Sequence, residues 1–307
     1  MSEAKSELSP GEAFESKSLR SEAELGRFIP EHYHYQMLLD EARMRGVWEA
    51  LATVVPQSKN KRVLELGCGT GVLSFYAAQA GAEQVWCVER QPGLADRARE
   101  LLEQNGVANR VSVVTGDAFT YLPPEPVDVV VCEMLHSALL RESQVAMIAA
   151  FRQRYAERFG PQLPIFVPQA SLLGVEPVAC DFDFFGYRAA LPLFEDPGNL
   201  LSERIRPLGP VVPYRIVDYN NALVEPLAWQ GALEIDAAGE CTGLRFITRN
   251  VLALRPDQSG VVEWMNQNLV IPLPAPQTVA PGQSLQAGFA YSPGDEIEAL
   301  AQSLRIA

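Results

Sequence analysis

The chain has 307 residues, of which 48% are hydrophobic and 21% charged, and its formal net charge is −13. This length exceeds what a single core usually needs, so we expect one large domain or two medium ones. The acidic balance argues against a duplex nucleic-acid partner, which requires a basic face, and is compatible with a cationic substrate. No run of about 18 apolar residues occurs, so no membrane span is expected.

Residues 1–28 are rich in serine and glutamate and are predicted to form a disordered tail. They contain no apolar signal core, so we expect a cytoplasmic protein. The five cysteines and three histidines show neither C-x-x-C pairs nor metal-ligand spacing. We therefore expect buried thiols, no disulfide framework and no metal site.

Apolar residues recur at helical spacing from Tyr33 to Val54, which predicts a helix before a polar linker. Predicted strands and helices then alternate: strands at 62–66, 84–89, 111–115 and 127–132, and helices at 72–80, 92–105 and 143–159. This order predicts a Rossmann-like α/β domain with a parallel sheet and helices on both faces.

Beyond Pro161 the chain becomes dense in proline and glycine, and short β-like runs replace the helices. These runs lie at 171–178, 229–235, 244–254, 268–273 and 285–291. Short strands bounded by turns predict a C-terminal β-barrel or sandwich. The expected organisation is a tail over 1–28, a Rossmann-like domain with its preceding helix over 29–166, and a barrel over 167–307.

A glycine-rich turn, Gly67-Cys68-Gly69-Thr70-Gly71, follows the first predicted strand and opens a helix. Glycines there allow a tight turn and let a ligand approach without a Cβ clash. A dinucleotide fingerprint would have glycine or alanine where Val72 stands, so the nicotinamide interpretation is disfavoured.

Acidic residues flank this turn. Glu65 lies two residues before the first glycine, and Glu89 ends the next strand, where a carboxylate can accept hydrogen bonds from ribose hydroxyls. Asp117 and Ala118 follow the third strand, where an acid can bind an adenine amino group. Together these features resemble the class I methyltransferases that use S-adenosyl-L-methionine and release S-adenosyl-L-homocysteine.

Two further segments resemble the protein arginine methyltransferase family. One is the Met37–Arg43 run, MLLDEAR, which matches the family's M-L-x-D-x-x-R helix. The other contains Glu133 and Glu142, nine residues apart as in the family's double-glutamate loop. The resemblance implies a nucleotide-binding sheet followed by a β-barrel, and a homodimer formed through an arm. The aromatic segment 181–213 is the candidate for that arm, for a substrate lid, or for packing on the barrel.

The resemblance also assigns roles to individual residues. Arg43 would bind the cofactor carboxylate and Glu89 its ribose. The other expected cofactor-binding residues are Met37, Glu65, Gly67, Cys68, Gly69, Gly71, Asp117 and Ala118. On the substrate side we expect Tyr35, Asp40, Glu263 and Trp264.

Glu133 and Glu142 are the expected catalytic residues. A guanidinium is planar, permanently charged and carries five N–H donors in a fixed fork. Two carboxylates can hold it bidentately and orient one nitrogen toward a methyl donor. Carboxylates that localise charge on the far nitrogens leave the attacking nitrogen richer in electrons.

The sequence departs from the family pattern at two positions. His136 stands where the family has a glycine after the first glutamate, and it is either a catalytic base or a hydrogen-bonded loop histidine. Glu263 replaces the histidine of the family's T-H-W loop, immediately before Trp264. If Glu263 faces Asp40, a cation such as a substrate amino group would have to lie between the two acids.

We expect methyl transfer to the guanidinium of free arginine, of a small guanidino compound or of protein arginine. Two alternatives stay open. One is a small-molecule O- or N-methyltransferase that uses His136 as its base, and the other is a non-catalytic scaffold that binds the cofactor.

Overall fold

The computed structural model describes residues 31–196, 204–221, 226–255 and 260–306. The tail predicted over residues 1–28 lies outside these ranges. The chain divides into two compact units, residues 1–39 and residues 40–307. In the first, the structure describes helix α3 (Glu31–Leu39), and the other helices and strands described below belong to the second.

The helix predicted from Tyr33 to Val54 is interrupted at Asp40. Helix α3 ends at Leu39, and helix α4 (Glu41–Val54) begins one residue after Asp40. Asp40 has φ −74° and ψ 85°, and its Oδ1 accepts a hydrogen bond from the backbone N–H of Arg43 at 2.9 Å. The side chain of Asp40 therefore caps a new helix, which corrects the prediction of one continuous helix.

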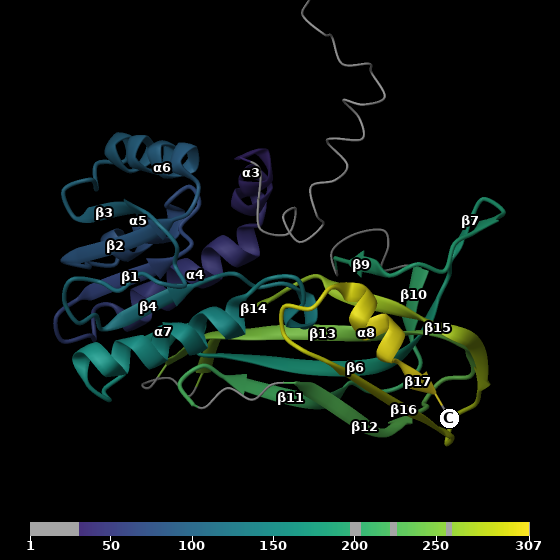
Figure 1. Cartoon of the computed structure of the whole chain (residues 1–307). Coiled ribbons are helices and arrows are strands. Elements are labelled where there is room, and N and C mark those ends of the chain that lie inside the picture. Colours follow the sequence, from purple (N-terminus) through teal and green to yellow (C-terminus); the bar gives the residue numbers. More distant parts are fainter. Residues whose placement is uncertain (1–30, 197–203, 222–225, 256–259, 307) are drawn as a thin grey trace, which may run out of the picture. The chain divides into compact units, whose positions relative to one another are not determined.

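The first half of the second unit is a five-stranded parallel sheet with the order β3-β2-β1-β4-β5 (Figure 1). Its strands are β1 (Arg62–Leu66), β2 (Gln84–Glu89), β3 (Val111–Thr115), β4 (Val129–Cys132) and β5 (Ile165–Val167). The helices between them are α5 (Val72–Gln79), α6 (Pro92–Gln104) and α7 (Gln144–Phe159). Right-handed crossovers place α5 and α6 on one face of the sheet and α7 on the other, which confirms the Rossmann-like fold.

The central strands are apolar because both of their faces are covered. All four residues of β4 are buried, as are the last four of β1. In the register of the sheet, Leu66 lies beside Val88 on one side and Cys132 on the other. The residues that follow these three positions therefore meet at one edge, where the strand order reverses and α/β proteins bind ligands.

The second half is antiparallel, as predicted for a barrel or sandwich. A seven-stranded sheet has the order β10-β6-β13-β15-β9, with β11 paired to β6 and β14 paired to β13, and a further sheet has the order β12-β16-β17. The long strands of the larger sheet are β6 (Ala170–Cys180), β13 (Gly239–Arg255) and β15 (Asn268–Val279). Its shorter strands are β9 (Leu193–Glu195), β10 (Ile205–Pro207), β11 (Val212–Asp218) and β14 (Gly260–Met265). The other sheet consists of β12 (Leu227–Glu234), β16 (Ser284–Tyr291) and β17 (Arg305–Ile306), with helix α8 (Ile297–Ser303) between the last two.

Helix α4 joins the two halves by a close approach at Gly46. A Cβ at that position would lie 3.0 Å from Leu252 Cδ1 on β13 and 3.4 Å from the carbonyl oxygen of Glu263 on β14. Nearby, Arg255 Nη2 donates to Glu49 Oε2 at 2.8 Å. These contacts bring the middle of α4 beside β14 and Trp264.

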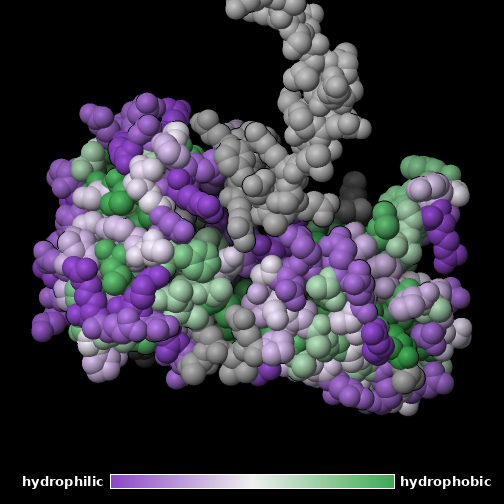
Figure 2. Space-filling model, viewed as in Figure 1, coloured by the Kyte–Doolittle hydropathy of each residue, from purple (hydrophilic) through white to green (hydrophobic). Residues whose placement is uncertain are grey.

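The aromatic segment after β6 forms a small hairpin. Strands β7 (Asp183–Phe184) and β8 (Tyr187–Arg188) pair across a turn at Phe185 and Gly186, both with left-handed φ. Phe182 is buried, whereas Phe185 and Tyr187 are fully and largely exposed. In Figure 2 the hairpin projects at the upper right, where hydrophobic (green) and hydrophilic (purple) residues lie side by side. The segment thus packs at its base and exposes aromatic side chains at its end.

All five cysteines are buried free thiols, as expected. Among the described residues, no helix combines the length and the apolar character that crossing a membrane requires.

Candidate active site

The glycine-rich turn occupies the edge where β1, β2 and β4 end. Gly67, Gly69 and Gly71 have φ values of +78°, +52° and +83°, a region that favours glycine. The backbone N–H groups of Gly67 and Cys68 both donate to the carbonyl of Val88, at 3.0 and 2.9 Å. A Cβ at Gly71 would also lie 3.1 Å from Leu102 Cδ1. The turn therefore needs glycine for its backbone conformation and for space.

Glu89 is fixed beside this turn. Its Oε2 accepts from Gly69 N at 3.0 Å and its Oε1 from Gln91 N at 2.8 Å. Each carboxylate oxygen retains a further acceptor site. The glycine cradle and this immobilised carboxylate fit the loop and the ribose contact that an S-adenosylmethionine site requires.

Asp117 and Ala118 follow β3 at the same edge of the sheet. Asp117 is exposed and its Oδ1 accepts from Phe119 N at 2.9 Å, while Ala118 is buried. The exposed carboxylate next to a buried alanine is available to a ligand placed against the sheet edge.

Glu65 and Cys68 lie in the protein interior. Glu65 is 2% exposed and accepts a hydrogen bond from the Ser74 hydroxyl of α5. Burial, and to a lesser extent Cys87, raises the pKa of Glu65 well above its ordinary value. Cys68 is 4% exposed. These positions suit support of the turn from inside rather than direct contact through a charged side chain.

Of the two glutamates of the predicted pair, Glu133 contacts a guanidinium directly, and Glu142 is influenced by its charge. Glu133, which directly follows β4, forms an ion pair with Arg43 of α4, and the two side chains are 7% and 12% exposed. Glu133 Oε1 is buried and has no hydrogen-bond partner within the described part of the chain. Burial raises the pKa of Glu142, while the charges of Arg43 and Arg141 lower it. The electrostatic field of Arg43 thus acts on both acids.

Trp264 completes this arrangement from the barrel side. It is 8% exposed, and the Arg43 guanidinium lies 5.1 Å from the centre of its ring. The distance is within the range of a cation–π contact. A carboxylate at its edge and an indole at its face make a suitable environment for a planar cation.

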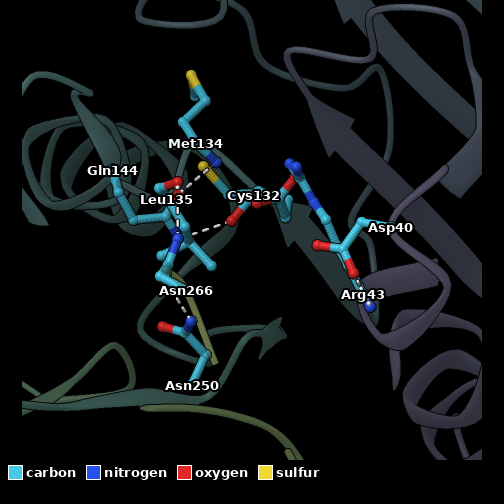
Figure 3. Close-up of polar contacts among 9 residues, drawn as sticks. Asp40, Arg43, Cys132, Met134, Leu135, Gln144, Asn250 and Asn266 are labelled. Carbon is cyan, nitrogen blue, oxygen red and sulfur yellow. Dashed lines mark hydrogen bonds and ion pairs between the residues drawn. The ribbon is translucent and has the colours of Figure 1, made fainter. Parts of the chain in front are cut away.

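Buried amides that the sequence did not reveal as site residues hold the backbone around Glu133 (Figure 3). Gln144, the first residue of α7, accepts from Met134 N at 2.9 Å and donates to the carbonyl of Cys132 at 2.6 Å. Asn266 donates to the carbonyl of Leu135 at 3.2 Å and accepts from Asn250 at 2.8 Å. In the sequence, Gln144 is visible only as a glutamine two residues after Glu142. Its neighbours in the chain do not indicate that its side chain binds the backbone on both sides of Glu133.

His136 is half-buried in the loop between the glutamates. Its Nδ1 lies 3.3 Å from the carbonyl oxygen of Ser137, and its ring packs edge-on against Phe194 of β9 with centroids 5.3 Å apart. Burial lowers the pKa of His136, so the imidazole is neutral near pH 7. These contacts are compatible with a packed loop histidine, and its role as a base stays a prediction.

Glu263 does not face Asp40 across a substrate cation. It lies on the outward face of β14, whereas its neighbours Val262 and Trp264 point inward. Its carboxylate is 3.6 Å from Arg249 Nε and lines a groove of about 470 Å³ with Glu41 and Arg45 of α4. The hypothesis is corrected because strand alternation turns the residue before an inward tryptophan away from the site.

Tyr35 and Met37 lie on α3, in the first compact unit. Tyr35 is 64% exposed and Met37 is partly buried. Their assigned contacts with substrate and cofactor stay predictions.

Comparison with known proteins identifies the class. Residues 63–183 match the family model of a methyltransferase domain. An uncharacterised protein of Methanothermobacter thermautotrophicus is 32% identical over 248 residues, which are 80% of this chain and 88% of that protein. The protein arginine N-methyltransferase PRMT10 of Oryza sativa is 37% identical over 133 residues, which are 43% of this chain but only 35% of the relative. The chain therefore aligns with about a third of that arginine methyltransferase.

Solved structures share the fold at low identity. Protein arginine methyltransferase 10 of Arabidopsis thaliana superposes with a TM-score of 0.70 at 20% identity, covering 87% of this chain and 89% of that one. The PRMT1 enzyme–prozyme complex of Trypanosoma brucei gives a TM-score of 0.68 at 20% identity, covering 83% and 86%. The chain is a class I S-adenosylmethionine-dependent methyltransferase, and it shares the fold of the protein arginine methyltransferases.

Proposed function

We propose that this protein transfers the methyl group of S-adenosylmethionine to a guanidinium nitrogen of arginine. The observation that carries the proposal is the ion pair of Glu133 with the guanidinium of Arg43, whose charge also lowers the pKa of Glu142. Glu133 keeps a buried oxygen, Oε1, without a hydrogen-bond partner in the described ranges. A buried carboxylate oxygen in this state is costly unless it accepts a donor, and a substrate guanidinium supplies donors in the required plane.

The chain's own residues account for binding and orientation. Glu89 and the turn at Gly67–Gly71 hold the cofactor. Arg43 binds the cofactor's carboxylate, as the resemblance to the protein arginine methyltransferases implies. When bound, S-adenosylmethionine supplies a methyl group on a sulfonium, which a nitrogen nucleophile can attack. Glu133 and Glu142 accept N–H groups of the substrate, fix its plane and draw positive charge away from the attacking nitrogen.

The acceptor is free arginine, a small guanidino compound or protein arginine. The relative from rice is named for protein arginine, and the net charge of −13 favours approach of any of these cations. We also infer a homodimer, because the hairpin exposes Phe185 and Tyr187, and aromatic side chains of this kind are enriched at interfaces. Light scattering of the wild type and of a Phe185→Ser, Tyr187→Ser double variant tests this inference, and an unchanged monomeric mass in both would contradict it.

The test of the reaction uses radiolabelled cofactor with free arginine, a small guanidino amine or an arginine-rich peptide. Glu133→Gln keeps the shape of the side chain but removes its charge, so transfer should fall to background while cofactor binding survives. Glu100→Gln is the matched control, because Glu100 forms an exposed ion pair with Arg97 on α6. Unchanged turnover in Glu133→Gln would contradict the proposal.

One observation favours a second candidate, a small-molecule O- or N-methyltransferase with His136 as its base. The lowered pKa of His136 leaves the imidazole neutral and able to accept a proton. That candidate requires His136→Ala to abolish transfer and Glu133→Gln to be tolerated. The opposite pattern supports guanidinium methylation, and cofactor binding by the wild type without transfer to any acceptor would point to a scaffold.

A further inference from the structure

The backbone just before Glu142 has an unusual conformation. Ala138, Leu139 and Arg141 have φ values of +56°, +58° and +61°, although none of them is glycine. L-residues rarely adopt this region, and they remain in it only where surrounding contacts determine the conformation. Three such residues within four positions therefore require fixation from outside the loop.

The fixation comes from the antiparallel half of the protein. Thr248 Oγ1 of β13 accepts from Ala138 N at 2.7 Å, and Tyr291 of β16 donates from its hydroxyl to the carbonyl of Ala138 at 2.9 Å. In the turn after β16, Gly294 N donates to the carbonyl of Leu139, and the carbonyl of Asp295 accepts from Arg141 N, both at 2.8 Å. Each left-handed residue is thus hydrogen-bonded to the barrel.

Tyr291 is the centre of this set. It is 4% exposed, and its hydroxyl lies 2.7 Å from the hydroxyl of Tyr214. The carbonyl of Ala138 can only accept, so the single proton of Tyr291 is committed to it and Tyr214 donates to Tyr291. This order gives a directed chain from β11 through β16 to the loop between the two glutamates.

We propose that Tyr291 and Thr248 are positioning residues that set the place of Glu142 by holding Ala138 in its left-handed conformation. The proposal rests on the guanidinium-binding function given above. Neither residue is assigned a contact with the substrate. The barrel contributes to catalysis through the backbone of the loop, in addition to Trp264.

Four variants test the proposal. Tyr291→Phe removes one hydroxyl, and Thr248→Val removes the acceptor of Ala138 N while keeping the side-chain shape. Thr248→Ser keeps the hydroxyl and is the conservative match. Tyr155→Phe is the control for loss of a buried tyrosine hydroxyl, because Tyr155 is bonded to Val127 in the other half of the protein.

The measurements are kcat and KM with an arginine-rich peptide, the dissociation constant of S-adenosylmethionine, and hydrogen exchange of residues 137–142. Tyr291→Phe and Thr248→Val should lower kcat by about tenfold or more, because small displacements of an orienting group have effects of that size. Cofactor affinity should stay unchanged, and exchange in the loop should rise. Thr248→Ser and Tyr155→Phe should retain the wild-type kcat and loop exchange.

A rescue variant sharpens the test. Glycine adopts the φ of residue 138 at little cost, so Ala138→Gly should restore part of the kcat lost in Tyr291→Phe. If Tyr291→Phe matches Tyr155→Phe in both kcat and loop exchange, the proposal is overturned. If Tyr291→Phe does not fold, Thr248→Val is compared with Thr248→Ser instead. Equal kcat and equal loop exchange in these two variants would then overturn the proposal. If the wild type methylates no guanidinium, the proposed function fails. The positioning proposal is then judged by hydrogen exchange of residues 137–142 alone, which should still rise in Tyr291→Phe and Thr248→Val.

Discussion

The side-chain amide of Gln144 holds the backbone on both sides of Glu133. It accepts from Met134 N and donates to the carbonyl of Cys132, and it is itself 1% exposed. One glutamine at the start of α7 therefore holds the backbone from which Glu133 projects. The interaction also joins the loop between the two acids to the helix that follows them.

Replacing this glutamine should harm both stability and turnover. Gln144→Leu leaves two buried backbone groups without partners, which should cost about 1–3 kcal/mol each in the free energy of unfolding. Turnover should fall because Glu133 is no longer held in one orientation. Gln153→Leu is the control on the same helix, since Gln153 is exposed and donates a hydrogen bond to Glu157. Denaturant unfolding and peptide methylation measure the two effects, and equal results for both variants would contradict the interpretation.

Two glutamates near the glycine turn should respond differently to loss of charge. Glu89→Gln keeps one acceptor oxygen but disturbs the bonds to Gly69 N and Gln91 N, so cofactor affinity should fall by about tenfold or more. Glu65→Gln should change affinity little, because burial already raises the pKa of Glu65 and favours its neutral form. Calorimetric titration with S-adenosylhomocysteine compares them. A larger loss in Glu65→Gln than in Glu89→Gln would reverse the two roles.

The parallel half could be predicted closely because its signals are local. The strands 62–66, 84–89 and 111–115 have the predicted bounds, since apolar runs and flanking turn residues determine where buried strands begin and end. The second half was less accessible. Strands β9 and β14 are short. In β9 the buried residue is the polar Glu195, and in β14 the exposed residues include Val261 and Met265, so neither strand alternates polar-out and apolar-in.

The site shows the same division. The positions of Glu133 and Glu142 were evident from their spacing, but the partners that hold them were not. Arg43 precedes Glu133 by 90 residues, and Tyr291 follows Ala138 by 153, so only the folded chain brings these pairs together. The prediction that Glu263 faces Asp40 failed for a different reason. The side chain of Glu263 points to the face of β14 opposite to that of Trp264, and the sequence does not show which face Trp264 occupies.

The acid limb of the pH–rate profile should report Glu142. A carboxylate is needed to accept from a guanidinium, and burial raises the pKa of Glu142, so kcat/KM should fall on acidification with a midpoint above the ordinary range of glutamate. Arg141 lowers this pKa through its charge, and Arg141→Gln should therefore move the midpoint further up. The control is Arg97→Gln, which removes an exposed charge on α6. An identical midpoint in Arg141→Gln and the wild type would exclude Glu142 as the titrating group.

The same shift has a consequence for stability. A carboxyl whose pKa is raised by folding stabilises the folded state fully below its unfolded pKa, and this contribution is lost as pH rises through the folded pKa. Glu142→Gln removes the titration and should therefore stabilise the protein relative to the wild type above that folded pKa, where Glu142 is ionised. Unfolding measured at pH 5 and pH 8 tests the sign, and a greater advantage for the variant at pH 5 would contradict it.

Two glycines near α5 and α6 should respond oppositely to alanine. Gly71 has φ +83°, and a Cβ there would lie 3.1 Å from Leu102 Cδ1, so Gly71→Ala combines backbone strain with a close contact. We expect a loss of about 1–3 kcal/mol in the free energy of unfolding and weaker cofactor binding, because the turn must shift. Gly93 lies in the first turn of α6, and a Cβ added there would meet no atom within 4 Å, so Gly93→Ala should be neutral or stabilise by up to about 1 kcal/mol. Urea unfolding measures the free energy of unfolding of both variants. Equal values would mean that the turn does not depend on the left-handed conformation of Gly71.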